Sequence, residues 1–198
     1  MLVTSYRLLE TCNLQQVTII SLLYQNFPHF YSMFLTNLYK VISFILLPFG
    51  ALLGFVSFFA LFMALGNFAI LLPLAITICT TIYIFSSFIF VIKGIINQKQ
   101  CKSSLKDWMK VNAYVTMFFA TSCVTNFIML KTNPQLKAEF SKQALAMQKN
   151  VPADAAAMMP QIINGILVAM LFLGVSLLLH ISLSFAFIKT KSNLFEEE

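Results

Sequence analysis

Charge is what this 198-residue chain has least of, because only 10% of its residues are charged while 59% are hydrophobic. Soluble globular domains carry about 25% charged residues. A chain this short leaves much of its surface exposed and cannot bury such an apolar excess in its own core. The shortage of charge therefore excludes a water-soluble enzyme, a disordered tail and a disulfide scaffold. Lipid must be the solvent for most of the chain.

Cysteine and histidine are also scarce, with four and two residues. Cys12, Cys79, Cys101 and Cys123 form no C-x-x-C pair and no short His/Cys spacing, so neither a zinc site nor a disulfide framework is indicated. Paired carboxylates for acid–base chemistry and a glycine-rich phosphate loop are missing as well. We therefore expect no cofactor and no enzymatic activity.

Long uncharged runs are what the sequence has instead. Residues 41–92 carry no charge, and a helix needs about 20 apolar residues to cross a bilayer. This run predicts two spans, of about 41–65 and 68–92, joined by a tight turn at Gly66-Asn67. Two further spans are predicted at about 111–130 and 161–188, with Pro160 at the beginning of the last. The predicted fold class is all-α, a polytopic four-helix membrane bundle.

The two ends of the chain differ from the predicted membrane domain, residues 41–190. Within residues 1–40, the apolar stretch 17–24 is too short to cross a bilayer and is surrounded by amide side chains. Two interpretations of this segment stand: an interfacial helix, or sequence upstream of a true start at Met33. The acidic C-terminal tail, residues 191–198, ends in three glutamates, Glu196–Glu198, which are expected to be solvated.

An additional helix is predicted between the third and fourth spans, over about 134–149. Asn133-Pro134 has the pattern of an N-cap followed by proline in the first helical position. The apolar residues that follow recur at helical spacing: Leu136, Phe140, Ala144 and Met147. We expect this amphipathic helix to lie outside the bilayer core, on the outer leaflet or across the mouth of the bundle.

Basic residues flank the spans and predict their orientation. Nine basic residues fall on the side of the membrane that holds both termini, and four fall on the other side. We therefore expect a multi-pass protein of the cell membrane with both termini in the cytoplasm. The densest cluster lies between the second and third spans: Lys93, Lys99, Lys102, Lys106 and Lys110. It either fixes topology or recognises anionic lipid head groups or an acidic partner. Basic flanks of this kind do not indicate nucleic-acid binding.

Polar side chains inside the spans form the candidate site. Ser176, His180 and Ser184 share one face of the fourth span. The third span carries a polar stripe, represented by Asn112, Thr116 and Asn126. We predict that these groups form interhelical hydrogen bonds, with His180 paired to a residue of the third span. A polar path, a proton relay or a ligand contact is the alternative.

Small residues in the first and fourth spans indicate where helices pack closely. They are Gly50, Gly54 and Ser57 in the first span, and Gly165 and Ala169 in the fourth. Packing within the chain is the predicted role, and a homodimer face is the alternative.

The spans hold no Asp, Glu, Lys or Arg, which disfavours ion-coupled transport because such proteins place ionisable groups at membrane depth. We predict a non-enzymatic accessory, assembly or self-associating scaffold subunit of a membrane complex. Its partners would be the lipid bilayer and either other membrane proteins or a second copy of the chain. The alternatives are a small transporter or channel component that uses the third span and His180, and a membrane enzyme or redox carrier.

Overall fold

The computed structural model describes the backbone of residues 2–64, 66, 68–146 and 153–195, and the side chains of residues 33–64, 66, 69–146 and 158–195. The described residues form helices and no strand beyond one isolated bridge. Four helices are long and apolar enough to cross a membrane: Met33–Ala64, Leu71–Ile96, Ser103–Thr132 and Met158–Thr190. The chain is thus all-helical, as predicted, and its four apolar helices indicate a multi-pass membrane protein.

The first helix is longer than predicted. α1 (Leu2–Ala64) continues without a break through residues 2–40, which form one compact unit, into residues 41–198, which form the second. The first span therefore does not begin at a new helix near Val41. Lys40 limits the uncharged run in the sequence, but a single lysine is a good helix former and does not end a helix.

The second span also extends past its predicted end. A short 3-10 helix, η1 (Phe68–Ile70), leads into α2 (Leu71–Phe90), which continues as a π-helix, η2 (Val91–Ile96). The backbone N–H of Asn97 donates to the carbonyl oxygen of Ile92, which prolongs this wider turn. The prediction stopped the span at Ile92 because Lys93 follows. A lysine can stay within a helix end by extending its ammonium toward the interface.

The remaining helices agree with the predicted order but not with every boundary. α3 (Ser103–Thr132) begins eight residues before the predicted 111, because the charges in its first two turns end the apolar run without ending the helix. α4 (Pro134–Ala146) occupies the position of the predicted additional helix, whose last three residues, 147–149, lie outside the described part. α5 (Ala153–Thr190) contains Pro160 in its interior, and its span-forming part begins at Met158.

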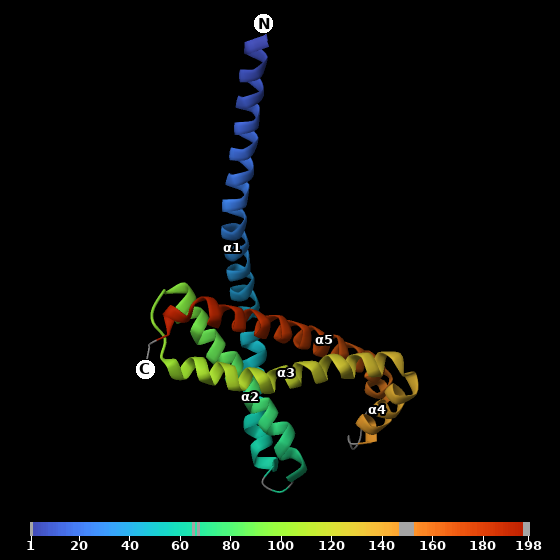
Figure 1. Cartoon of the computed structure of the whole chain (residues 1–198). Coiled ribbons are helices and arrows are strands. Elements are labelled where there is room, and N and C mark those ends of the chain that lie inside the picture. The colour runs from blue at the N-terminus through green and yellow to red at the C-terminus, as the bar shows by residue number, and fades with distance from the viewer. Residues whose placement is uncertain (1, 65, 67, 147–152, 196–198) are drawn as a thin grey trace. The chain divides into compact units, whose positions relative to one another are not determined.

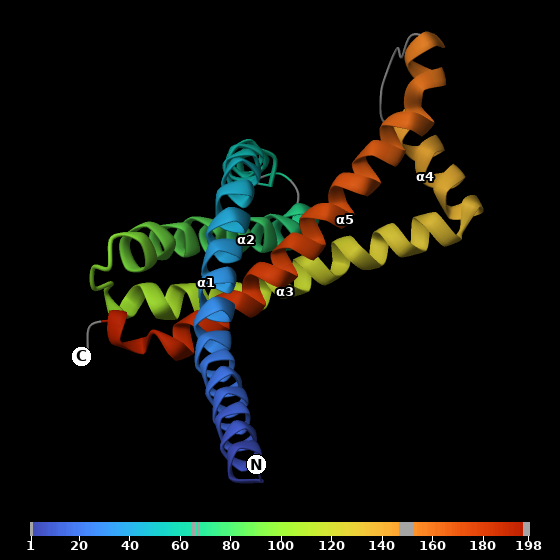
Figure 2. The same ribbon diagram turned by 90° about the horizontal axis from the view of Figure 1, so that it is seen from above.

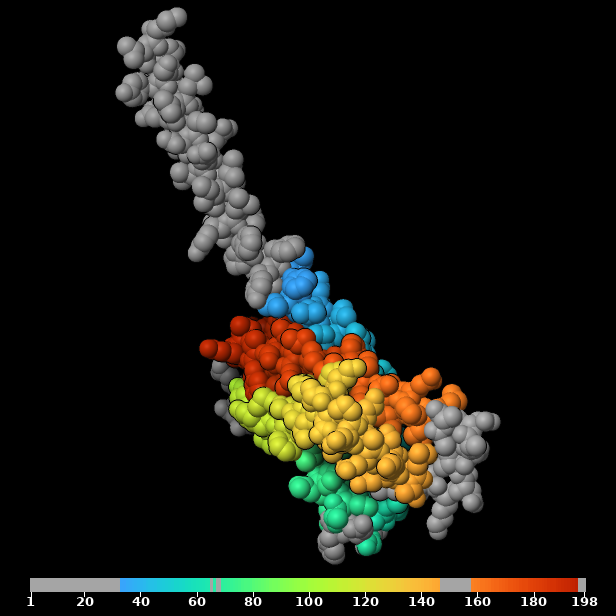
Figure 3. All heavy atoms as spheres, turned by 90° about the vertical axis from the view of Figure 1, so that its right-hand side faces the viewer, coloured from blue at the N-terminus to red at the C-terminus, as the bar shows by residue number. Residues whose placement is uncertain are grey.

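Within the second unit, two pairs of helices cross. α3 and α5 run antiparallel and side by side, and both run across the hairpin that α2 makes with the last part of α1 (Figures 1 and 2). α4 connects α3 to α5 at the end where these two helices diverge (Figure 2). The space-filling view shows α3, α4 and α5 as one continuous face (Figure 3).

Glycines mark the closest helix approaches. A Cβ at Gly174 would lie 2.8 Å from the carbonyl oxygen of Ala120, so α3 and α5 meet there backbone to backbone. A Cβ at Gly50 would lie 2.7 Å from Cγ2 of Ile84, so the first span packs closely on the second at this point. Real Cβ atoms do not approach other atoms this closely, so both positions require glycine or a shift of the neighbour.

The other predicted packing residues differ in whether they are close to a neighbouring helix. A Cβ at Gly54 would lie 3.2 Å from Cγ2 of Thr81, and Ser57 is buried with no hydrogen-bond partner for its hydroxyl among the described residues. Gly165 has open space around it, and Ala169 is exposed. The predicted packing within the chain is therefore wrong at these last two positions, because the neighbouring Ile163 and Leu167 are the residues that pack against α3, and Gly165 and Ala169 lie outside that contact.

Candidate functional site

A buried hydrogen-bonded group, which we call the polar junction, joins three helices. It consists of Ser43 of α1, Tyr83 of α2, and His180 and Ser184 of α5. The Ser43 hydroxyl lies 2.7 Å from Nε2 of His180, and the Tyr83 hydroxyl lies 2.9 Å from Nδ1 of the same ring. Tyr83 is also hydrogen-bonded to Ser184, at 2.8 Å. None of the four side chains is more than 2% exposed.

Both ring nitrogens of His180 therefore have a partner on another helix. A neutral imidazole donates from one nitrogen and accepts at the other. If Nε2 donates to Ser43, then Tyr83 donates to Nδ1 and accepts from Ser184. If Nδ1 carries the proton, the directions of these three hydrogen bonds reverse. Either way, a neutral ring satisfies both of its nitrogens, which a group buried this deeply in an apolar interior requires.

The junction corrects one prediction and adds two residues that the sequence reasoning missed. We expected the partner of His180 on the third span, but Ser43 and Tyr83 belong to the first and second. Serine and tyrosine are common in membrane helices, so neither is distinctive by type. Only the crossing of α5 over the hairpin brings them to His180. The predicted residue Ser184 joins the junction, whereas Ser176 is half-buried one turn away without a hydrogen bond to it.

The polar stripe of α3 is satisfied mainly within its own helix. The Asn112 amide donates to the carbonyl oxygen of Trp108, and the Thr116 hydroxyl donates to the carbonyl oxygen of Asn112. Both residues are buried. Such bonds reach back one turn along the same helix, so neither of them joins α3 to a neighbouring helix. The structure does not combine this stripe with His180 into one site.

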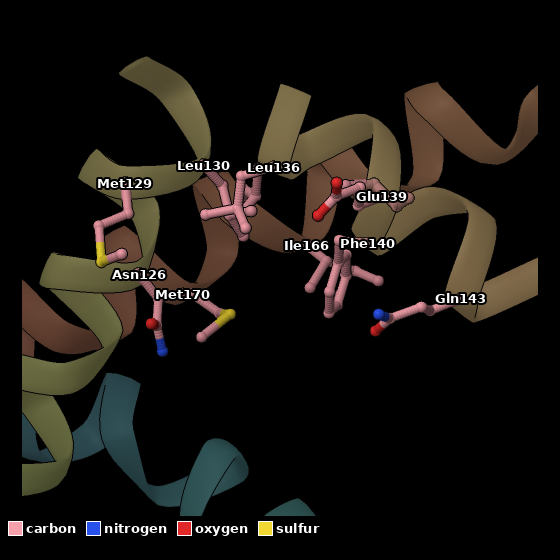
Figure 4. A pocket seen from close by; sticks show the side chains of 11 residues that line it. Asn126, Met129, Leu130, Leu136, Glu139, Phe140, Gln143, Ile166 and Met170 are labelled. Carbon is pink, nitrogen blue, oxygen red and sulfur yellow. The ribbon is translucent and has the colours of Figure 1, made fainter. Parts of the chain in front are cut away.

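Asn126 lies elsewhere, in a cavity of about 370 Å³ between α3, α4 and α5 that we call the lateral pocket (Figure 4). Three of its lining residues are polar: Asn126, Glu139 and Gln143. The others are apolar: Met129, Leu130, Leu136, Phe140, Ile163, Ile166, Leu167 and Met170. Cavities that take small ligands or apolar side chains have this composition, with a few polar groups that orient the occupant.

α4 is held at the lateral pocket by local contacts. The side-chain oxygen of Asn133 accepts hydrogen bonds from the backbone N–H groups of Gln135 and Leu136, so it caps the helix as predicted. The Lys137 ammonium donates to the Asn164 amide oxygen of α5 at 2.6 Å. Phe140, on the pocket side of α4, is still 48% exposed. The pocket is therefore open, unlike the polar junction.

The segment that carries the five clustered lysines, residues 93–110, which we call the basic loop, is connected to the C-terminal segment. The Cys101 N–H donates to the carbonyl oxygen of Leu194 at 2.7 Å. Phe195 stacks on Phe90 with ring centroids 5.2 Å apart, and the Lys106 ammonium lies 5.8 Å from the centre of the Phe195 ring. No sequence pattern indicated this connection, because its residues Cys101, Leu194 and Phe195 form no recognisable motif; the glutamates expected to be solvated, Glu196–Glu198, lie outside the described residues.

The chemistry available in these sites is limited. Among the residues whose side chains are described, no group of three His, Cys, Asp or Glu residues is placed to hold a metal ion. Comparisons of the chain with protein-family models, with curated proteins and with solved structures found no match.

Proposed function

We propose that this chain is a non-enzymatic accessory or assembly subunit of a membrane complex, and that it holds an apolar segment of a partner in the lateral pocket. The observation that carries the proposal is the pocket itself. It is open, mostly apolar and bordered by α4, which bears the half-exposed Phe140. Large aromatic side chains in open apolar pockets are typical anchors of protein interfaces.

In this proposal the polar junction has a structural role. Its two interhelical contacts to His180 hold α5 on the α1–α2 hairpin, since hydrogen bonds between membrane helices each contribute about 0.6–1.7 kcal/mol. A proton relay or a ligand site needs access from an aqueous side or from a cavity. The near-complete burial of all four side chains therefore argues for the structural role rather than for transport.

The proposed orientation has both termini in the cytoplasm. It rests on the nine basic residues of that side against four on the other. α4 then lies outside the hydrocarbon on the opposite side, next to Lys131 at the end of α3. Along α3, Trp108 and Asn126 are roughly 27 Å apart at 1.5 Å per residue, close to the thickness of a bilayer core. The basic loop and the lateral pocket thus face opposite sides of the membrane.

Cysteine labelling tests this orientation. In a background without the four native cysteines, K142C should react with an impermeant maleimide added to intact cells, and K102C should react only after permeabilisation. The reverse pattern would show that the orientation is inverted. Equal labelling of both positions in intact cells would contradict the four-span topology.

Photo-crosslinking tests the pocket. A photoreactive phenylalanine analogue in place of Phe140 should capture a partner in stoichiometric amount in the native membrane. The same analogue at Val168, which is 61% exposed on α5 and does not line the pocket, is the matched control and should capture lipid. A solute flux through liposomes that contain only this chain, with no crosslinked partner, would instead support the transport alternative.

A further inference from the structure

A second cavity, of about 300 Å³, lies at the opposite end of α3, between α2, the basic loop and the first turns of α3. We call it the basic pocket. On α2 and η2, Ser86 and Lys93 line it and share one helix face, seven residues apart. Lys102, Ser104, Leu105 and Trp108 line it from the other side. The pocket therefore has charged, hydroxyl and apolar parts arranged along the end of a span.

The polar groups of the basic pocket suit an anion. Lys93 and Lys102 bring two ammonium groups, and Asp107, the single acid in the first two turns of α3, does not line the pocket. The pocket also lies beside the N-terminus of this 30-residue helix, whose N-cap Lys102 makes no side-chain capping hydrogen bond. The partial positive charge of a helix N-terminus favours an anion in this position.

Ser86 points independently to a ligand. It is only 8% exposed, yet its hydroxyl has no hydrogen-bond partner among the described residues, and it lines the pocket. Most other hydroxyls in the described part of α2 behave differently: those of Thr77, Thr80, Thr81 and Ser87 donate to carbonyl oxygens of their own helix. A hydroxyl that lines a pocket and makes no hydrogen bond within its own helix can bond to an occupant of that pocket.

We propose that the basic pocket binds the phosphate-bearing head group of an anionic membrane lipid. Lys93, Lys102 and the first turn of α3 would hold the phosphate, and Ser86 and Ser104 would donate hydrogen bonds to the ester oxygens. Leu105 and the 57% exposed Trp108 would contact the beginning of the acyl chains. Tryptophan prefers this level of the membrane, and lysines on the cytoplasmic side face the leaflet rich in anionic lipids.

The apolar part of the pocket favours a lipid over a soluble phosphate or a polyanion. A free phosphate ion would leave Leu105 and Trp108 without a partner, and a nucleic acid would be too large for a cavity of about 300 Å³. The loop side of the pocket is held in shape by the contact of Cys101 with Leu194. The π-helical turn that carries Lys93 is also a feature frequently found at functional sites.

The single tryptophan of the chain makes the test direct, because Trp108 lines the pocket. The full-length protein in mild detergent is titrated with short-chain phosphatidylglycerol, with phosphatidylcholine of the same chain length, and with glycerol phosphate. We expect a saturable change of tryptophan fluorescence with phosphatidylglycerol at concentrations at least tenfold lower than with the other two compounds. An equal response to phosphatidylcholine or to glycerol phosphate would overturn the proposal.

Two double variants separate a site from general surface charge. K93Q/K102Q removes the two lysines of the pocket and should weaken phosphatidylglycerol binding at least tenfold. K99Q/K110Q removes two lysines of the same loop that do not line the pocket and should change binding less than threefold. S86A should weaken binding about two- to fivefold. Equal weakening by both double variants, each checked for wild-type helical content, would overturn the proposal.

This inference goes beyond the proposed function and can fail separately from it. K93Q/K102Q should leave photo-crosslinking from Phe140 unchanged, because the two pockets lie at opposite ends of α3.

Discussion

The polar junction and the lateral pocket differ in the burial and hydrogen bonding of their polar side chains. At the junction, three helices converge, and Ser43, Tyr83, His180 and Ser184 are hydrogen-bonded to one another and buried. At the lateral pocket, α3 and α5 diverge and the short α4 connects them, while Phe127 and Leu130 of α3 still pack on Ile163 and Leu167 of α5 (Figure 2). Asn126 and Glu139 there line an open cavity.

From this difference we expect stability and partner binding to depend on different regions of the protein. A buried polar group in a membrane interior must be paired, and pairing across helices fixes their relative position. An open cavity contributes little to stability, because its lining lacks contacts on one side. The junction is therefore expected to respond to mutation in stability, and the lateral pocket in binding.

Gly174→Leu should have the largest effect on stability. The added side chain would collide with the backbone of α3 at Ala120, which cannot move aside as a side chain can. We expect a loss near the upper end of the roughly 1–3 kcal/mol typical of overpacking, measured by unfolding in mixed detergent micelles. Gly165→Leu is the matched control on the same helix, where space is open, and it should change the free energy of unfolding by less than about 0.5 kcal/mol.

His180→Leu should lower the free energy of unfolding by about 1–3 kcal/mol, because it removes two interhelical hydrogen bonds and leaves Ser43 and Tyr83 without these partners. His180→Asn keeps a donor and an acceptor and should be milder in the same assay. If both variants were fully stable while partner binding or flux was abolished, the structural role of His180 would be refuted and the transport alternative favoured.

Tyr83→Phe sharpens this test with almost no change in shape. It removes the hydroxyl that connects His180 to Ser184, and should cost about 1–2 kcal/mol. In a double-mutant cycle with His180→Leu, the two losses should be clearly non-additive, since both variants break the same contact. Additive losses would mean that the two side chains act independently.

Asn133→Ala should weaken α4 locally. It removes the oxygen that accepts from the N–H groups of Gln135 and Leu136, and N-caps of this kind contribute about 0.5–2 kcal/mol. Hydrogen exchange should therefore rise across 134–146 while α3 and α5 stay protected. Gln135→Ala, which removes no described side-chain hydrogen bond, is the control. Exchange at the unfolded rate in the wild-type protein would show that α4 is not stably formed.

Phe140→Asp should have the smallest effect on global stability, below about 0.5 kcal/mol, since this side chain is already 48% exposed. It should nevertheless raise hydrogen exchange across α4 and abolish partner capture by the photoreactive analogue placed at Leu136, a second residue of α4 that lines the lateral pocket. Ala138→Asp places the same carboxylate on an exposed position of α4 that does not line the pocket, and should preserve capture. Loss of capture in both variants would mean that charge on α4, not the pocket, controls binding.

Much of the architecture could be predicted from the residues alone. The uncharged runs predicted four candidate spans, and Asn133-Pro134 predicted the beginning of α4, because length, hydropathy and capping are local properties. Boundaries were less reliable. The turns at Lys40, Lys93 and Lys106 remain helical, because a charged residue ends an apolar run without ending the hydrogen-bonded backbone.

The sequence by itself predicted that most of this chain is surrounded by lipid, and it identified His180 as the histidine within the predicted spans. Only the tertiary structure decided the partners of that histidine. The crossing of α5 over the hairpin brings Ser43 and Tyr83 to the ring, although 137 and 97 residues separate them from it along the chain. The two pockets arise in the same way, from helix ends that diverge or meet a loop. Pairing across helices depends on crossing and register, which no local pattern encodes.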